Sequence, residues 1–170
     1  EIAEQGHAEE IREATGLQLS AYFPAAKMAW LLRNGGEERQ KRAADGELCL
    51  GTIDSWLVYK LTGDHAFKTD FSNASRTQLF NLKTLAWDEK ICEMFGIPVC
   101  ALARVCDSDA VYGTTTMEGL FSEPVPICGV LGDSHAALFG QGCLKPDMIK
   151  ATYGTGSSLM MNIGDKPIQS

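Results

Sequence analysis

The sequence has no hydrophobic run long enough to cross a membrane, and it is poor in basic charge. No apolar stretch approaches the ~20 residues that a transmembrane helix needs. Lys and Arg number 15 against 22 Asp and Glu, a formal net charge of −7, and the densest basic cluster is only Arg39-Gln40-Lys41-Arg42. Such a surface repels nucleic acid and anionic lipid. We therefore expect neither a nucleic-acid partner nor a membrane partner.

The sequence also lacks the cysteine and histidine spacings of metal sites. The three histidines are widely scattered, and the six cysteines include no Cys-x-x-Cys pair. Most cysteines have aliphatic neighbours, so the pattern predicts buried, reduced thiols in a cytoplasmic protein, with no metal site. The acidic start, Glu1-Ile2-Ala3-Glu4, is the reverse of a secretory signal.

The 170 residues allow one ordinary domain or pieces of two. There is no Pro-rich or Ser/Gly-rich linker and no internal repeat. The sequence starts without Met in a polar stretch typical of a helix. We expect an excised segment of a longer protein.

Three stretches have the pattern of helices. Pro24 can open the first, with Met28, Leu31 and Leu32 on one face and Asn34-Gly35-Gly36 as its end; the charged residues 37–42 should then lie in solvent. Thr52 or Asp54 can cap the second, which Gly63 would end in a left-handed conformation. The third starts near Asp88, buries Ile91, Met94 and Phe95, and closes at Gly96 and Pro98.

Short strands alternate with these helices. The pattern predicts strands at residues 65–68 and 77–80 around a polar turn at residues 72–75. It predicts a buried strand at residues 126–131 and a β-hairpin formed by residues 148–153 and 159–163. The mixture favours an α/β fold.

The junction Gly132-Asp133-Ser134 follows the predicted buried strand and opens a helix. At a helix N-terminus the ionised form of Asp133 is favoured, and that carboxylate could accept a proton from a substrate hydroxyl. Asp is also a preferred helix cap, so spacing alone leaves Asp133 as either a cap or a base.

The turn of the predicted hairpin reads Gly154-Thr155-Gly156-Ser157-Ser158. Two glycines and three hydroxyls can direct backbone N–H and O–H donors at phosphate oxygens. A tight turn can need glycine for its backbone conformation alone, so this alternative also stays open. A hydroxyl-activating carboxylate followed by a phosphate loop provides two parts of phosphoryl transfer to an alcohol.

At these residues the sequence resembles the FGGY family of carbohydrate kinases, and most closely its members that act on glycerol. The stretch from Tyr22 to Asn34 fits the family's first signature at its aromatic, Pro, Lys, Trp and Asn positions. Further matching blocks follow in the family's order: residues 51–57, 69–77, 79–81, 132–133, 136–141 and 152–156.

The resemblance implies an α/β fold of the ribonuclease-H-like, actin-like ATPase type, in which two domains close on ATP and a sugar or polyol. Residues 1–142 would be the C-terminal part of the first domain, and residues 143–170 the beginning of the second. The complete protein is expected to be a homo-oligomer.

The resemblance also implies roles for individual residues. Asp133 would be the general base, and Thr155 with Gly154 and Gly156 would contact the phosphates of ATP, which carries Mg²⁺. Tyr22 would border the substrate, although it could instead be an aromatic staple at a helix start. The acceptor would be glycerol or a related polyol or ketose.

Two departures from the glycerol-specific pattern concern the acceptor. Those members follow the catalytic Asp with Gln and place Phe three residues after the hairpin Thr, whereas this sequence has Ser134 and Ser158. Serines in place of a long amide and an aromatic ring should enlarge the substrate pocket and make it more polar. A larger polyol or ketose is therefore an alternative acceptor to glycerol.

Parts of the family's catalytic apparatus have no counterpart in these residues. They are the N-terminal Asp-Gly-Thr phosphate loop, the Arg-Glu pair that grips the substrate, and the adenine site. Phosphoryl transfer depends on such groups acting together, so the chain alone should be inactive.

Two other functions are compatible with parts of this pattern. A non-catalytic actin-like nucleotide-binding module would share the hairpin but needs no base facing an alcohol. A GDSL-like hydrolase would use Ser134, but Ser134 and His135 are adjacent on a predicted helix and cannot form a nucleophile–base pair.

Overall fold

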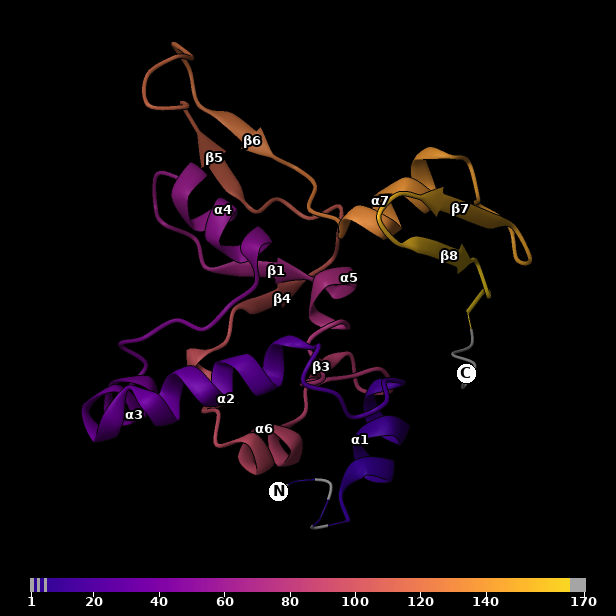
Figure 1. Ribbon diagram of the computed structural model, residues 1–170. Helices are drawn as coiled ribbons and strands as arrows, with labels where there is room; N and C mark the ends of the chain where they lie inside the picture. Colours follow the sequence, from indigo (N-terminus) through magenta and orange to yellow (C-terminus); the bar gives the residue numbers. More distant parts are fainter. Residues whose placement is uncertain (1, 3, 5, 166–170) are drawn as a thin grey trace. The chain divides into compact units, whose positions relative to one another are not determined.

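The computed structural model describes residues 2, 4 and 6–165, and its contacts divide the chain into two compact units (Figure 1). The first unit is Glu1–Val130 and the second is Leu131–Ser170. Both contain helices and strands, so the fold is mixed α/β as predicted. None of the helices described is long and apolar enough to span a membrane.

The helices of the first unit follow in chain order. They are α1 (Ala8–Thr15), α2 (Pro24–Asn34), α3 (Gly36–Ala44), α4 (Ile53–Leu61), α5 (Phe71–Ala74) and α6 (Glu89–Phe95), followed by a 3₁₀ turn at Val99–Ala101. Pro24 opens α2 as predicted, because a missing N–H is harmless in the first helical turn.

The inner face of α2 is narrower than predicted. Met28 and Leu32 are buried, but Leu31 is 44% exposed and the prediction for it is wrong. Ala25 and Ala29 complete the buried stripe instead, at the spacing of one helix face. The charged segment after α2 lies in solvent as expected, but it forms α3, of which only Ala43 is buried.

The strands of the first unit are short and paired in twos. β1 (Lys68–Asp70) pairs in parallel with β4 (Arg104–Cys106), β2 (Phe80–Asn81) pairs antiparallel with β3 (Ala86–Trp87), and β5 (Gly113–Thr115) pairs antiparallel with β6 (Val125–Ile127). A parallel bridge between Leu50 and Leu102 lies outside these strands.

Two strand predictions are wrong in detail. The strands predicted at residues 65–68 and 77–80 are shifted to Lys68–Asp70 and Phe80–Asn81, and most of the segment predicted as a polar turn between them is the helix α5. The strand predicted to be buried, β6, is largely exposed because it pairs only with β5.

A buried carboxylate explains why the polar segment becomes helical. Asp70 is fully buried and caps α5: its oxygens accept the backbone N–H groups of Ser72 and Asn73, both at 3.0 Å. They also accept the side chains of Ser72 at 2.6 Å, Asn73 at 2.7 Å and Ser108 at 2.7 Å. Ser108 follows β4, so this one carboxylate ties α5 to the segment after the neighbouring strand.

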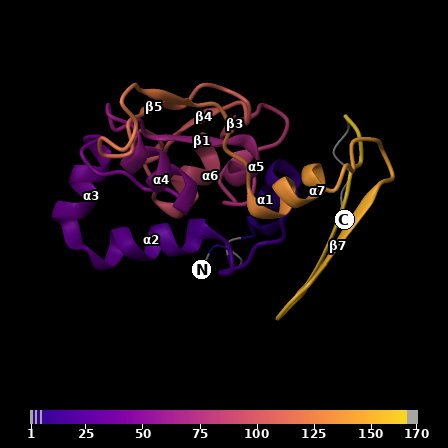
Figure 2. The ribbon, with the colours of Figure 1, turned by 90° about the horizontal axis from the view of Figure 1, so that it is seen from above.

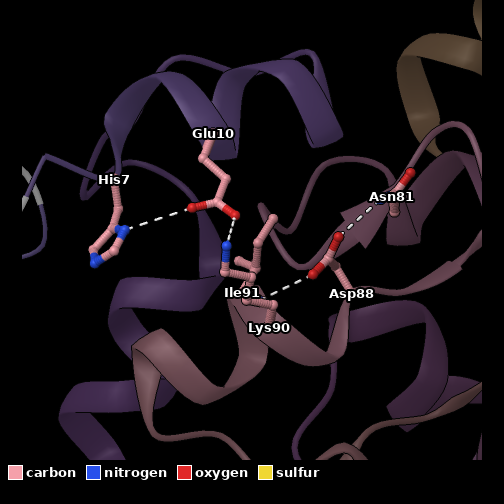
Figure 3. Close-up of polar contacts among 6 residues, drawn as sticks. All are labelled: His7, Glu10, Asn81, Asp88, Lys90 and Ile91. Carbon is pink, nitrogen blue, oxygen red and sulfur yellow. Dashed lines mark hydrogen bonds and ion pairs between the residues drawn. The ribbon is translucent and has the colours of Figure 1, made fainter.

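The third predicted helix is confirmed as α6. Asp88 caps it by accepting the N–H of Ile91 at 3.0 Å, and Asn81 donates to the other carboxylate oxygen at 2.8 Å (Figure 3). Gly96 ends it in the left-handed conformation. Lys90 of α6 also pairs with Glu10 of α1, which joins the two helices.

The end of α4 does not follow the prediction. Gly63 is not left-handed, and the cap residue is Thr62, whose backbone is extended. The Thr62 hydroxyl donates to the carbonyl of Val58 and accepts the N–H of Ala66, both at 2.8 Å. The side chain of Thr62 therefore satisfies backbone groups at this helix end, and no glycine conformation is needed.

The cysteines are less buried than expected. Cys92 and Cys143 are buried and Cys106 is partly buried, whereas the remaining cysteines, Cys49, Cys100 and Cys128, are exposed; all six are free thiols. Cys49 shows the reason: side chains alternate along an extended segment, so burial of Leu50 turns its neighbour outward.

The second unit contains α7 (Asp133–Gly140), β7 (Ile149–Tyr153) and β8 (Ser157–Met161). The two strands form the predicted hairpin, and α7 packs against both of them. Figure 2 shows this hairpin almost edge on, with α7 to one side of it.

Candidate functional site

The hairpin loop is shorter than predicted and fully exposed. Tyr153 pairs with Ser157, so only Gly154-Thr155-Gly156 connects the strands. The N–H of Gly154 donates to the carbonyl of Gly156 at 3.1 Å and closes the loop. Among the hydrogen bonds of the described residues, none uses the N–H of Thr155 or Gly156 or the Thr155 hydroxyl, so these donors are available to a ligand.

The conformation of this loop does not itself demand glycine. Neither Gly154 nor Gly156 has a left-handed backbone. A Cβ atom built on Gly156 would meet nothing within 4 Å, and one on Gly154 would lie 3.8 Å from the Gly156 carbonyl oxygen. The two glycines instead leave the backbone bare on the outside of the loop, where another molecule can approach closely.

Asp133 is the first residue of α7, and the cap position belongs to Gly132. The cap alternative therefore does not describe Asp133. Its side chain is exposed, and one carboxylate oxygen accepts the N–H of Ser134 at 2.6 Å. The other oxygen is available for a substrate hydroxyl, at the helix end whose dipole favours negative charge.

Ser134 follows on α7 and is partly buried. It lies directly before His135 on the same helix, and consecutive helical side chains point in different directions. This arrangement does not provide the nucleophile–base contact of a hydrolase.

The second unit therefore brings most of the predicted site residues into one compact structure. Asp133 and Ser134 lie on α7, Thr155 lies in the hairpin loop, and α7 contacts the strands that carry the loop. No group of three or more potential metal ligands occurs in the part of the chain that the structure describes.

Lys150 was not predicted as a site residue. It lies on β7, is only 1% exposed, and donates to the hydroxyl of Thr152 at 2.8 Å. Its spacing of two from Thr152 places both residues on one face of a strand, but the sequence did not show which face is covered.

Tyr22 belongs to the first unit, directly before the cap residue of α2. Its ring is 78% exposed, packs edge to face against Phe23, and lies 5.7 Å from the ammonium of Lys27. A hydrophobic staple would pack Tyr22 against an apolar residue at the fourth helical position, which here is Lys27. Tyr22 is thus an exposed aromatic surface beside an open, mostly apolar groove of about 400 Å³ lined by Ala21, Ala26, Lys27, Trp30 and Leu31.

Comparison with known proteins agrees with the family motifs. Residues 1–140 match the model of the FGGY family of carbohydrate kinases, N-terminal domain. The chain is 46% identical over all of its length to glycerol kinase from Xanthomonas campestris pv. campestris. It is 52% identical over 165 residues to glycerol kinase from Pseudothermotoga lettingae. The chain spans only about a third of the length of these relatives, 34% and 33%.

Solved structures show the same relationship. The crystal structure of Plasmodium falciparum glycerol kinase with ADP matches 99% of the chain with a TM-score of 0.90 and 33% identity, over 34% of its own length. Xylulose kinase from Lactobacillus acidophilus matches 93% of the chain with a TM-score of 0.77 over 32% of its own length; at 23% identity this shows a shared fold only. The chain belongs to the FGGY family of carbohydrate kinases.

Proposed function

We propose that this chain forms part of an ATP-dependent kinase that phosphorylates a hydroxyl group of a polyol or ketose. One observation carries the proposal: an exposed carboxylate and an exposed loop of free donors occur in the same compact unit of an FGGY-family chain. Its relatives in bacteria and in Plasmodium falciparum are glycerol kinases, and the structure of the latter holds ADP.

The residues divide into a base and a phosphate-binding loop. Asp133 accepts the proton of the acceptor hydroxyl as that oxygen becomes nucleophilic. The free N–H groups of Thr155 and Gly156 and the Thr155 hydroxyl bind nucleotide phosphates, and Gly154 keeps the approach open. ATP, with its bound Mg²⁺, supplies the phosphoryl group. Tyr22 borders the acceptor.

The acceptor is larger than glycerol. Ser134 and Ser158 are both at least partly accessible, and they stand where glycerol-specific members have a long amide and an aromatic ring. Short hydroxyl side chains leave room for additional carbons and can hydrogen-bond their oxygens. Turnover of the complete kinase on a panel of polyols and ketoses tests this, and a clear preference for glycerol would contradict it.

The chain is part of a larger catalytic assembly. We propose a domain boundary of the complete kinase near Gly142, with residues 1–142 in the first kinase domain and 143–170 in the second, so the compact unit Leu131–Ser170 includes residues from both sides of this boundary. The purified 170-residue chain should show no ATP-dependent phosphorylation, and measurable activity would contradict this. That the complete kinase is a cytoplasmic homo-oligomer stays a prediction, and its oligomeric state can be measured by light scattering.

The variant Asp133→Asn in the complete kinase tests the central role. It removes a proton acceptor but keeps size and exposure, so kcat should fall about 10²–10⁴-fold while ATP affinity is retained. Asp147→Asn is the matched control, since Asp147 is an exposed carboxylate of the same unit whose left-handed backbone Asn tolerates well. Unchanged turnover of Asp133→Asn would refute Asp133 as the base, whereas ATP binding without any turnover by the unmutated complete protein would favour a non-catalytic nucleotide-binding module.

A further inference from the structure

Lys150 is a buried lysine on the face of the hairpin that carries Thr152 and Ser158. It is the only buried residue of β7, at 1% exposure, and the other residues of that strand are exposed. Residues 131–165 contain no arginine, and their other lysine, Lys145, is exposed. The second unit therefore holds one of its few cations in its interior.

The partners of this ammonium group are hydroxyls. Nζ of Lys150 donates to Oγ1 of Thr152 at 2.8 Å and more weakly to Oγ of Ser158 at 3.5 Å. Among the ion pairs of the described residues, none joins Lys150 to a carboxylate. Burying a positive charge without a negative partner is costly, and two neutral hydroxyls compensate for it only partly. An anion at this place would supply the missing charge.

Lys150, Thr152 and Ser158 together also have more hydrogen-bond donors than acceptors. An ammonium group has three donors and no acceptor, and each hydroxyl that accepts from it keeps its own proton to donate. One N–H of Lys150 and the O–H groups of Thr152 and Ser158 have no acceptor in the described part of the chain. These three neighbouring residues therefore hold three donors without an acceptor in the described part of the chain.

These donors are reachable from solvent although the charge is not. Thr152 is exposed and Ser158 is partly exposed, and they are directly paired across the two strands next to the loop. The ammonium group of Lys150 is buried, but the two hydroxyls that it contacts can be reached from solvent. Its positive charge polarises their O–H bonds and makes them stronger donors. Charge-assisted donors of this kind suit phosphoryl oxygens, which accept strongly and carry negative charge.

We propose that Lys150, Thr152 and Ser158 form a phosphoryl-binding site on one face of the hairpin, in addition to the loop donors of Thr155 and Gly156. The proposal rests on the proposed kinase function and names a second set of contacts for the transferred group. Thr152 and Ser158 contact the phosphoryl oxygens, while Lys150 acts as a positioning residue that orients the two hydroxyls and supplies charge. The phosphoryl group can belong to the nucleotide or to the phosphorylated product.

The site can be tested on the ¹⁵N-labelled 170-residue chain by NMR at constant ionic strength. Inorganic phosphate, ATP and glycerol 3-phosphate, which serves as a small polyol phosphate in place of the product, are added in separate titrations, with chloride as the reference anion. We expect a saturable shift of the slowly exchanging Lys150 Nζ signal and of the Thr152 and Ser158 amides with phosphate. ATP and glycerol 3-phosphate distinguish the nucleotide from the product as the source, by which of them binds more tightly.

Variants separate the charge from the fold of the hairpin. Lys150→Met should weaken phosphate binding at least about tenfold, Lys150→Arg should restore most of it, and Lys145→Met should leave it unchanged. Hydrogen exchange across the Tyr153–Ser157 pair reports whether the hairpin is intact. If Lys150→Met unfolds it, Thr152→Val and Ser158→Ala decide, because each removes one donor and should still weaken binding.

The outcomes also separate this site from the kinase function. Shifts at Thr155 with ATP, but none at Lys150 Nζ and no effect of the Lys150 and hydroxyl variants, would overturn the site and leave the proposed function standing. Phosphate binding that depends on Lys150, combined with no ATP-dependent phosphorylation of any polyol or ketose by the complete protein, would overturn the proposed function and leave the site standing.

Discussion

Replacing Asp70 by alanine should destabilise the first unit more than any change of a surface carboxylate. The Asp70 side chain is fully buried and accepts five hydrogen bonds, from the backbone and side chains of Ser72 and Asn73 and from the hydroxyl of Ser108. Alanine removes both carboxylate oxygens and with them all five of these hydrogen bonds. The segment after β4 is also released from α5.

The magnitude follows from the number and kind of bonds. A hydrogen bond to a charged group contributes about 1.5–3 kcal/mol, but bonds that share one carboxylate are not additive. Breaking a buried charged network by removing one partner costs about 3–5 kcal/mol, and we expect Asp70→Ala to fall in that range. Asp70→Asn keeps one acceptor oxygen and the shape, so it should cost less.

Urea unfolding followed by circular dichroism measures this change as a difference in the free energy of unfolding. Asp109→Ala is the matched control, because Asp109 is an exposed carboxylate in the loop next to Ser108 and should change stability by less than about 0.5 kcal/mol. A loss of only about 1 kcal/mol for Asp70→Ala, the value of an ordinary helix cap, would refute the network argument. Faster hydrogen exchange at the Ser72 and Asn73 amides would locate the damage.

Three further predictions follow from the same structure. Burial alone would raise the pKa of Asp70, but its hydrogen bonds from Ser72, Ser108 and Asn73 outweigh burial and lower the pKa below the usual value of an aspartate. The stabilisation by these hydrogen bonds should be complete above pH ~4 and should disappear as the pH falls through the lowered pKa of Asp70. In Asp70→Asn the stability should therefore depend less on pH in this range. A pH profile identical to that of the unmutated chain would contradict the assignment. Burial, followed by the nearby carboxylates of Asp88 and Glu89, raises the pKa of Cys92 to about 12, so iodoacetamide at pH 8 should modify the exposed Cys128 and spare Cys92, as mass spectrometry of the peptides can show. Asp88→Ala should cost about 1–2 kcal/mol of unfolding free energy, because α6 loses the cap to Ile91; a loss below about 0.3 kcal/mol in urea unfolding would refute the capping role.

The features that local sequence predicted well are those decided within a few residues. Pro24 opens α2, Asp88 caps α6 and Gly96 ends it, because capping and backbone conformation depend on near neighbours. The hairpin around Thr155 was predicted for the same reason: two strands joined by glycines form a local structure.

The errors arose where a distant partner decides the outcome. The segment after Asp70 was expected to be a turn, but Asp70 caps it as a helix, and the same carboxylate also accepts a hydrogen bond from Ser108, which follows the distant strand β4. Leu31 has the apolar character of an inner residue, yet it is exposed because the neighbours of α2 cover only a narrow stripe. Such pairings depend on tertiary contacts that no local pattern contains.

For the candidate site, too, some features were identified from the sequence and others only from the structure. The amino-acid sequence by itself identified the FGGY family, Asp133 as the candidate base and Thr155 with its glycines as the candidate phosphate loop, because these residues form short contiguous motifs with a characteristic chemistry. Only the tertiary structure showed that Gly132, not Asp133, takes the cap position, and that Gly154 and Gly156 have no left-handed backbone.

Lys150 is the clearest case of what the tertiary structure alone decided. In the sequence it is one lysine among 15 basic residues, and a lysine on a short strand is normally exposed. Packing of α7 against the hairpin and the pairing of Thr152 with Ser158 place its ammonium in the interior between two hydroxyls. Burial depends on which face of a strand another element covers, and that is a property of the folded chain.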